Sequence, residues 1–438
     1  MFAIPLAWLQ LKRETVRLLV ALAGIGFAVI LMFLQLGFQA ALFESAVTLH
    51  QKLEGDIFLI SPQSTSLTSM KSFPNRRLYQ SLGFAGVDAI SPIYLGLGIW
   101  KNPYWEGPPA SQTRSILVIG MVPGDKVFAL PEVAENQSQL RLTDVVLFDR
   151  ASREEFGPIS KKFEALKATG GLVKSEIESR RVEVGGLFSL GASFGADGNL
   201  ITSDLNFRRI FSKREKGMID VGLIKLKSGV DLEKTLARFR QNLPGTSRTD
   251  PKKAADQTKE DFVVGDVRVL SKKAFIAFEQ NYWKESTAIG FIFTLGTAIG
   301  FVVGTVIVYQ ILYTDVTDHL AEYATLKAMG YKNRYLLSVV FQEAIILAVM
   351  GYIPGYILCL GLYNVTRSAT ALPISMTLDR GILVLCLAIL MCVISGAVAV
   401  RKVQDADPAD IFYVATDYHD RERQSLFWGR ATPQADLV

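Results

Sequence analysis

The sequence predicts a membrane protein with four transmembrane α-helices and a large mixed α/β domain outside the cytoplasm. Half of the 438 residues are hydrophobic and the mean hydropathy is +0.26, which is too apolar for an ordinary soluble enzyme of this length. The apolar residues gather in four long blocks with almost no charge. A more polar region with many strand-like segments separates the first block from the second.

The first block, residues 18–43, contains no charged residue. A helix needs about 20 residues to cross a bilayer, whereas a cleaved signal peptide has an apolar core of roughly 7 to 15. We therefore interpret the block as an uncleaved first transmembrane helix. Residues 1–17 combine Trp8 and other apolar side chains with a basic end, which predicts an amphipathic helix in the membrane interface, with an unstructured start as the alternative. Lys12, Arg13 and Arg17 precede the block and Glu44 follows it, so the N-terminus is expected in the cytoplasm.

Residues 44–285 form the expected extracytoplasmic domain. Two helices are predicted in it, Leu205–Phe211 and Asp231–Leu243, and Asp231 is a suitable N-cap for the second. Residues 191–199 and 244–257 have the composition of loops. Seven segments with β-branched or alternating residues are predicted strands: Asp56–Ile60, Asp88–Trp100, Arg114–Val122, Val145–Phe148, Arg181–Phe188, Val221–Leu226 and Val263–Leu270.

The second transmembrane helix is expected at residues 286–314, which carry no charge. The segment Ala274–Lys284 before it has helical spacing and is expected to continue straight into it. Gly296, Gly300 and Gly304 recur at every fourth position. Such a stripe lets a second helix approach closely, although glycine is also simply frequent in membrane helices.

The third and fourth transmembrane helices are expected at residues 335–366 and 381–400, joined by a short periplasmic loop at 367–380. Glu343 is the one charge in the third helix, so it is a functional candidate. A structural hydrogen bond to a neighbouring helix, or snorkelling to the interface, is the alternative that we favour. Pro354 should kink this helix. The basic residues then place the 401–438 tail in the cytoplasm, giving a multi-pass inner-membrane protein with both termini cytoplasmic.

A short cytoplasmic helix is expected at residues 315–334, between the second and third spans. Asp315 and Asp318 lie near its start and Lys327 near its end, as the helix dipole prefers. Gly330 stands where a helix commonly ends in the left-handed conformation. From the residues alone, a solvated linker helix and a docking helix both remain open.

The stretch Glu322–Gly330, EYATLKAMG, resembles a signature of the FtsX/MacB permease superfamily. In that superfamily the segment is a coupling helix that docks into a groove on a separate cytoplasmic ATPase. The resemblance implies a MacB-like periplasmic core domain and a homodimer that works by mechanotransmission. It also implies that the ATPase-coupling residues are Glu322, Tyr323, Leu326, Lys327, Met329 and Gly330.

Residues 4–14 and 38–43 are further similar to the DevC-type permeases of cyanobacterial glycolipid exporters. That likeness implies a DevA-like ABC ATPase, a DevB-like membrane-fusion adaptor and a TolC-like outer-membrane duct as partners. An FtsX-like scaffold that controls a cell-wall hydrolase, and a LolC-like permease that extracts lipoproteins, are the alternatives. The sequence does not choose the cargo, which we expect to reach the outer domain without crossing between the helices.

No chemistry-bearing motif suggests an enzyme. The sequence has no G-x-x-x-x-G-K-[ST] phosphate-binding loop, so ATP hydrolysis is expected in a partner subunit, unlike MacB proper, which fuses both parts. The histidines His50, His319 and His419 lie in different regions, so no metal site is expected and no cofactor is implied. The net charge of +5 gives no case for nucleic-acid binding.

Overall fold

The computed structural model describes residues 15–108, 111–167, 170–243, 262–264, 266–319, 322, 325, 329–331, 333–370 and 372–405. Most of the expected interfacial helix at residues 1–17, the loop at 244–257 and the tail after residue 405 lie outside these residues. The chain divides into two compact units. One is helical and comprises Met1–Gly37, Phe293–Val365 and Ser375–Val438, and the other is α/β and comprises Phe38–Ile292 and Thr366–Ile374.

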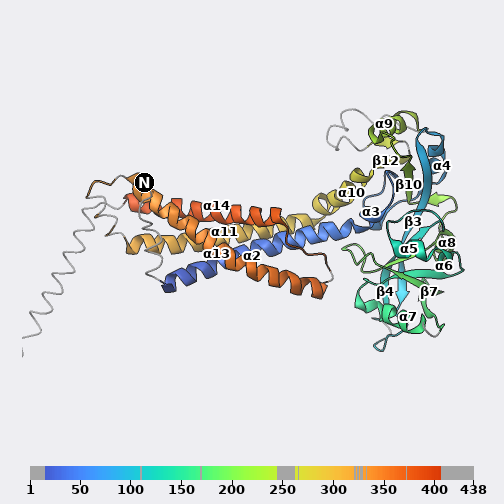
Figure 1. The fold of residues 1–438 in the computed structure, drawn as a ribbon, viewed down its shortest axis with the longest axis horizontal. Helices are drawn as coiled ribbons and strands as arrows, with labels where there is room; N and C mark the ends of the chain where they lie inside the picture. Colours follow the sequence, from blue (N-terminus) through green and yellow to red (C-terminus); the bar gives the residue numbers. More distant parts are fainter. Residues whose placement is uncertain are drawn as a thin grey trace, which may run out of the picture. The chain divides into compact units, whose positions relative to one another are not determined.

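Among the described residues, four helices are long and apolar enough to cross a membrane, which makes this a multi-pass membrane protein. They are α2 (Thr15–Ala46), α11 (Ala288–Asp318), α13 (Asn333–Thr370) and α14 (Leu378–Asp405) (Figure 1). Each is longer than its charge-free run, because a helix continues past the hydrocarbon core until a capping or loop signal stops it. Together with the mixed α/β unit, the four helices confirm the predicted fold class.

The described part of the α/β unit is built on one ten-stranded sheet, in the order β11-β12-β1-β10-β3-β4-β8-β5-β7-β6, and on a separate two-stranded pair, β2-β9. The predicted strands are confirmed with shifts of a few residues at their ends, and the last of them is two strands, β11 and β12. The strands are β1 (Ile57–Ile60), β2 (Phe73–Pro74), β3 (Val87–Lys101), β4 (Thr113–Met121), β5 (Val145–Asp149), β6 (Val173–Ile177), β7 (Arg180–Phe188), β8 (Asn199–Ser203), β9 (Met218–Ile219), β10 (Val221–Leu226), β11 (Phe262–Val264) and β12 (Val267–Ser271).

Strand β3 belongs to two halves of the large sheet. Its first half pairs with β10, with Ile93 opposite Val221, and its second half pairs with β4 from Ile93 to Lys101. At its end, Trp100 and Lys101 also pair with Ile177 and Glu176 of β6. This last pairing closes β3, β4, β8, β5, β7 and β6 into a ring, which we call the strand ring. Its interior is filled by large buried side chains, among them Trp100, Phe148 and Phe156.

Short helices cover the sheet. They are α3 (Thr48–Lys52), α4 (Arg76–Gln80), α5 (Pro131–Glu135), α6 (Gln137–Leu140), α7 (Ile159–Lys167), α8 (Asp204–Ile210), α9 (Leu232–Asn242) and α10 (Lys272–Asn281). The two predicted helices appear as α8 and α9. The N-cap at Asp231 is confirmed, because its carboxylate accepts hydrogen bonds from the amides of Glu233 and Lys234.

The prediction that Ala274–Lys284 continues straight into the second transmembrane helix is wrong. After α10 the chain makes a π-helical turn, Tyr282–Ser286, and Thr287 is then extended before α11 begins. The Thr287 hydroxyl bonds the Trp283 carbonyl at 2.7 Å, which satisfies an acceptor that a continuous helix would have used. A Cβ at Gly290 would collide with the Lys284 carbonyl, so glycine permits this break.

Candidate functional site

The expected coupling segment is described only in part. Glu322 is helical and exposed, whereas Tyr323, Leu326 and Lys327 lie outside the described residues. Met329 donates its backbone N–H to the Thr325 carbonyl at 3.0 Å and leaves 62% of its side chain exposed. Gly330 follows with φ of +90°, the left-handed conformation in which helices commonly end. An exposed apolar side chain therefore stands at a helical turn between α11 and α13.

The acidic residues at the start of the predicted 315–334 helix occupy a different place from the one expected. Helix α11 continues to Asp318, so Asp315 and Asp318 lie in its last turn and do not begin a new helix. Negative charge at a helix C-terminus is unfavourable, and Arg17 of α2 offsets it. Its guanidinium lies 3.5 Å from Asp315 Oδ1 and contacts Asp318. The sequence could not pair these residues, because 301 positions separate Arg17 from Asp318.

The glycine stripe on α11 faces two neighbouring helices of the helical unit. A Cβ at Gly304 would lie 2.7 Å from the Ala28 Cβ of α2 and would collide with Met391 of α14. A Cβ at Gly296 would meet only the mobile end of Gln35 at 2.7 Å, and one at Gly300 would make an ordinary contact at 3.6 Å. Of the three positions, Gly304 is the one where close packing depends on glycine.

Helix α13 carries a second glycine seam that the sequence analysis did not single out as packing. Gly351 and Gly355 flank Pro354, and a Cβ on them would lie 2.6 Å from Ile25 and 2.9 Å from Val29 of α2. Helix α13 continues through Pro354. Glu343, nearer the N-terminal end of the same helix, has 1% of its surface exposed. Its burial places it among protein side chains of the helical unit and away from lipid.

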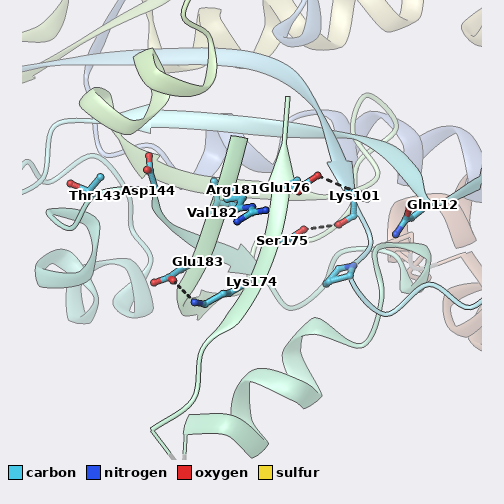
Figure 2. A pocket seen from close by; sticks show the side chains of 11 residues that line it. Lys101, Gln112, Thr143, Asp144, Lys174, Ser175, Glu176, Arg181, Val182 and Glu183 are labelled. Carbon is cyan, nitrogen blue, oxygen red and sulfur yellow. Dashed lines mark hydrogen bonds and ion pairs between the residues drawn. The ribbon is translucent and has the colours of Figure 1, made fainter. Parts of the chain in front are cut away.

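A hollow of about 670 Å³ lies on the outer face of the β6–β7 hairpin, next to the closure of the strand ring (Figure 2). Two ion pairs cross it, Lys101 Nζ to Glu176 Oε2 and Lys174 Nζ to Glu183 Oε1, both at 3.3 Å. Figure 2 shows Arg181 between them, near the centre of the hollow. These side chains point outward because β6 alternates buried and exposed positions, with Val173 and Ile177 turned inward.

A second hollow, of about 450 Å³, adjoins the first and shares Asp144 and Arg181 with it. It lies between the tip of the β6–β7 hairpin and α8, and it is lined by Asp144, Glu178, Ser179, Arg180, Arg181, Arg209, Ile210 and Ser212. We call it the arginine hollow. Arg180 donates two hydrogen bonds to Asp144, at 2.7 and 2.9 Å, and this partner lowers the pKa of the Asp144 carboxyl.

A buried His–Glu pair lies where α3 meets α10. Glu279 is 2% exposed, and its two oxygens accept hydrogen bonds from the Leu67 amide at 2.7 Å and from the Trp283 indole at 2.8 Å. Burial raises the pKa of Glu279 to about 7. His50, fully buried against Phe275, has its Nε2 3.9 Å from Glu279, and burial lowers the pKa of His50 to about 3. At a pH between about 3 and about 7, the Glu279 carboxyl is protonated and the His50 imidazole is unprotonated, so both side chains are neutral.

Comparison with known families finds a match in the helical part of the chain. Residues 291–408 match the FtsX-like permease C-terminal family. The match covers α11, the coupling segment, α13 and α14. This part of the chain is therefore similar to the C-terminal domain of FtsX-like permeases. No curated protein matches this sequence.

Several solved structures are similar to the α/β unit at low sequence identity. The periplasmic region of MacB from Actinobacillus actinomycetemcomitans is 9% identical with a TM-score of 0.31, and the match covers 52% of this chain and 94% of that one. The extracellular domain of the transporter YknZ from Gram-positive bacteria is 14% identical with a TM-score of 0.27, covering 41% and 87%. A domain described as a permease protein from Porphyromonas gingivalis is 13% identical with a TM-score of 0.26, covering 50% and 88%.

Proposed function

We propose that this protein is the membrane subunit of an ABC exporter that works by mechanotransmission. The observation that carries the proposal is the family match over residues 291–408, which spans three membrane helices with the coupling segment between the first two of them. In this function a separate ATPase closes on ATP and moves the coupling segment. The membrane helices pass that motion to the α/β unit, which acts on partners and cargo outside the cytoplasm.

The contact with a DevA-like ABC ATPase is assigned to the turn that ends at Gly330. Met329 is 62% exposed there and Tyr331 is 46% exposed. Apolar side chains of this size are worth roughly 1.5 to 3 kcal/mol each when a partner buries them. Exposed apolar residues in a turn outside the spans suit a protein contact better than they suit water.

A homodimer is supported by helix α11, which is the least buried of the four spans, since only 17% of its most apolar stretch is buried. One stripe along it is exposed, at Leu295, Ile299, Val302 and Val306, with spacings of three and four residues. Such spacing suits packing against a helix of a second copy. The rest of the exposed apolar surface of the four spans suits contact with lipid.

The α/β unit is the part that we assign to a DevB-like adaptor leading to a TolC-like duct. Cargo, with glycolipid as one candidate, would reach it from the outer leaflet of the inner membrane or from the periplasm. Two features of the helical unit favour this route over one between the helices. Gly304 packs closely against α2 and α14, and Glu343 is the one acidic residue predicted inside a span.

The ATPase contact is tested by changing Leu326 and Met329 to Asp in the full chain. The double variant should lose the ATPase on co-purification while staying folded and dimeric. Leu378→Asp is the matched control, because Leu378 is a 78% exposed apolar residue at the start of α14, on the expected outer side. Retention of the ATPase by the double variant would place the contact elsewhere.

Topology and partner class need two further measurements. Cysteines introduced at Ser193 and Ser375, after removal of the three native ones, should react with an impermeant thiol reagent from outside, and one at Asn333 should be protected. Affinity purification with mass spectrometry then separates the alternatives. An adaptor supports export, a cell-wall hydrolase supports an FtsX-like scaffold, and a lipoprotein carrier supports a LolC-like permease.

A further inference from the structure

The arginine hollow at the tip of the β6–β7 hairpin has more cationic than anionic groups available to a ligand. Its two carboxylates are already engaged. Asp144 accepts both hydrogen bonds from Arg180, and Glu178 Oε1 accepts the Ile99 amide at 2.8 Å. Arg209 reaches Asp144 only at 3.9 Å, and both Arg209 and Arg181 are exposed.

Arg181 is the central cation of this surface. Within the described residues its guanidinium has no side-chain hydrogen bond and no ion pair. It lines both hollows, so a ligand that bound it could extend in two directions. Ser179 and Ser212 add hydroxyl groups to the wall of the smaller hollow. Two guanidinium groups with neighbouring hydroxyls form a donor set that suits carboxylate or phosphate oxygens.

Backbone strain is concentrated around the same hollow. Among the described residues, the non-glycine residues with positive φ are Asp144 at 62°, Glu178 at 50° and Ser179 at 65°, and all three line it. A two-residue hairpin turn of this kind ordinarily takes Asn and Gly, which adopt positive φ at lower cost. Strain of this sort clusters at binding sites, where it holds side chains in a required position.

We propose that the arginine hollow binds an acidic segment of an extracytoplasmic partner protein, with Arg181 and Arg209 each receiving a carboxylate. An extended peptide fits better than a small anion, because the surface continues past Arg181 into the larger hollow of about 670 Å³. The ion pairs there, Lys101–Glu176 and Lys174–Glu183, offer both signs of charge to the flanking residues of a peptide. The identity of this partner as the adaptor rests on the proposed function, whereas the acidic chemistry does not.

The test uses the full chain in neutral-lipid nanodiscs and a fluorescent peptide of six alternating Glu and Ser residues, with a Gln–Ser peptide as the probe control. Arg181→Gln with Arg209→Gln should weaken binding of the acidic peptide roughly tenfold or more, as expected for two lost charge-assisted contacts. Lys213→Gln with Lys216→Gln removes the same charge from exposed positions outside the hollow and should leave binding within about twofold.

Equal weakening by both double variants, or equal binding of the two peptides, would overturn the proposal. Displacement of the peptide by millimolar inorganic phosphate, or preference for vesicles with anionic lipid, would assign the site to phosphate or a lipid headgroup and also overturn it. Co-purification of the ATPase is measured on the same samples. A wild-type sample that binds the acidic peptide but carries no ATPase would count against the proposed function alone.

Discussion

The buried His50–Glu279 pair predicts an unusual dependence of stability on pH. The folded pKa of Glu279 is raised from 4.5 to about 7, so its contribution is fully present below pH 4.5 and is lost as the pH rises through 7. The folded pKa of His50 is lowered from 6.5 to about 3, so its contribution is present above pH 6.5 and is lost as the pH falls toward 3. Between pH 4.5 and 6.5 the two slopes are opposite and should cancel.

The perturbation that exposes this balance is Glu279→Gln. It removes one titration and leaves the other, so stability should now fall as the pH decreases from 6.5. At about 1.4 kcal/mol per pH unit, the two-unit interval from 6.5 to 4.5 gives a difference of roughly 3 kcal/mol between variant and wild type. Gln offers one acceptor oxygen where Glu279 offers two, and the lost bond to Leu67 or Trp283 shifts the variant by a similar amount at every pH.

The assay is hydrogen exchange at the Leu67 amide in the full chain, because that amide bonds Glu279 directly. After correction for intrinsic exchange rates, its protection in wild type should stay within a few-fold from pH 6.5 to 4.5. Protection in the variant should fall by about a hundredfold, which corresponds to roughly 3 kcal/mol. Glu135→Gln, at an exposed position, is the control and should follow wild type. A wild type that loses protection as steeply as the variant would refute the raised pKa of Glu279.

Three further predictions concern single positions. Gly304→Ala should destabilise the helical unit by about 1 to 3 kcal/mol in thermal unfolding, because the new Cβ would overlap that of Ala28. The control Gly300→Ala should be nearly neutral, and equal effects of the two changes would contradict the packing at Gly304. Ser179→Gly should stabilise the α/β unit by about 1 kcal/mol by relieving positive φ, and destabilisation would mean that its side chain is needed for packing. Val302→Cys, in a chain without native cysteines, should form disulfide-linked dimers on oxidation. Leu358→Cys, equally exposed on α13, should not, and equal yields of the linked dimer from both variants would argue against a dimer through α11.

The membrane helices and most of the strands were predictable because their signals are local. A charge-free run fixes a span, and alternating or β-branched residues fix β3, β4 and β10. Strand β8 was missed because its five residues, Asn199–Ser203, are all buried, so they give no alternation. The polar ones are satisfied by distant groups, as when Asn199 donates to Asp149 at 2.8 Å, and a sequence cannot show that.

The candidate sites were less predictable, because they depend on long-range pairing. The coupling segment is predicted from a contiguous pattern that ends at Gly330, and its role in docking an ATPase stays a prediction. The arginine hollow brings together Asp144, Arg181 and Arg209, which belong to separate elements, and only the closed strand ring makes them neighbours. The break at Thr287 was also missed, because no proline marks it and the interruption depends on how Gly290 packs against Lys284.

The shared strand β3 has a consequence for how such a domain could diversify. Residues 94–220 leave the first half of the sheet after Ile93 and return at Val221, and these two residues are paired neighbours, with the Asp220 amide bonded to the Ile93 carbonyl at 3.1 Å. The strand ring is thus a cassette whose two ends meet at one register position. The arginine hollow lies wholly inside it. A graft of this cassette between relatives could therefore exchange one extracytoplasmic partner for another while the membrane helices and the coupling segment stay unchanged.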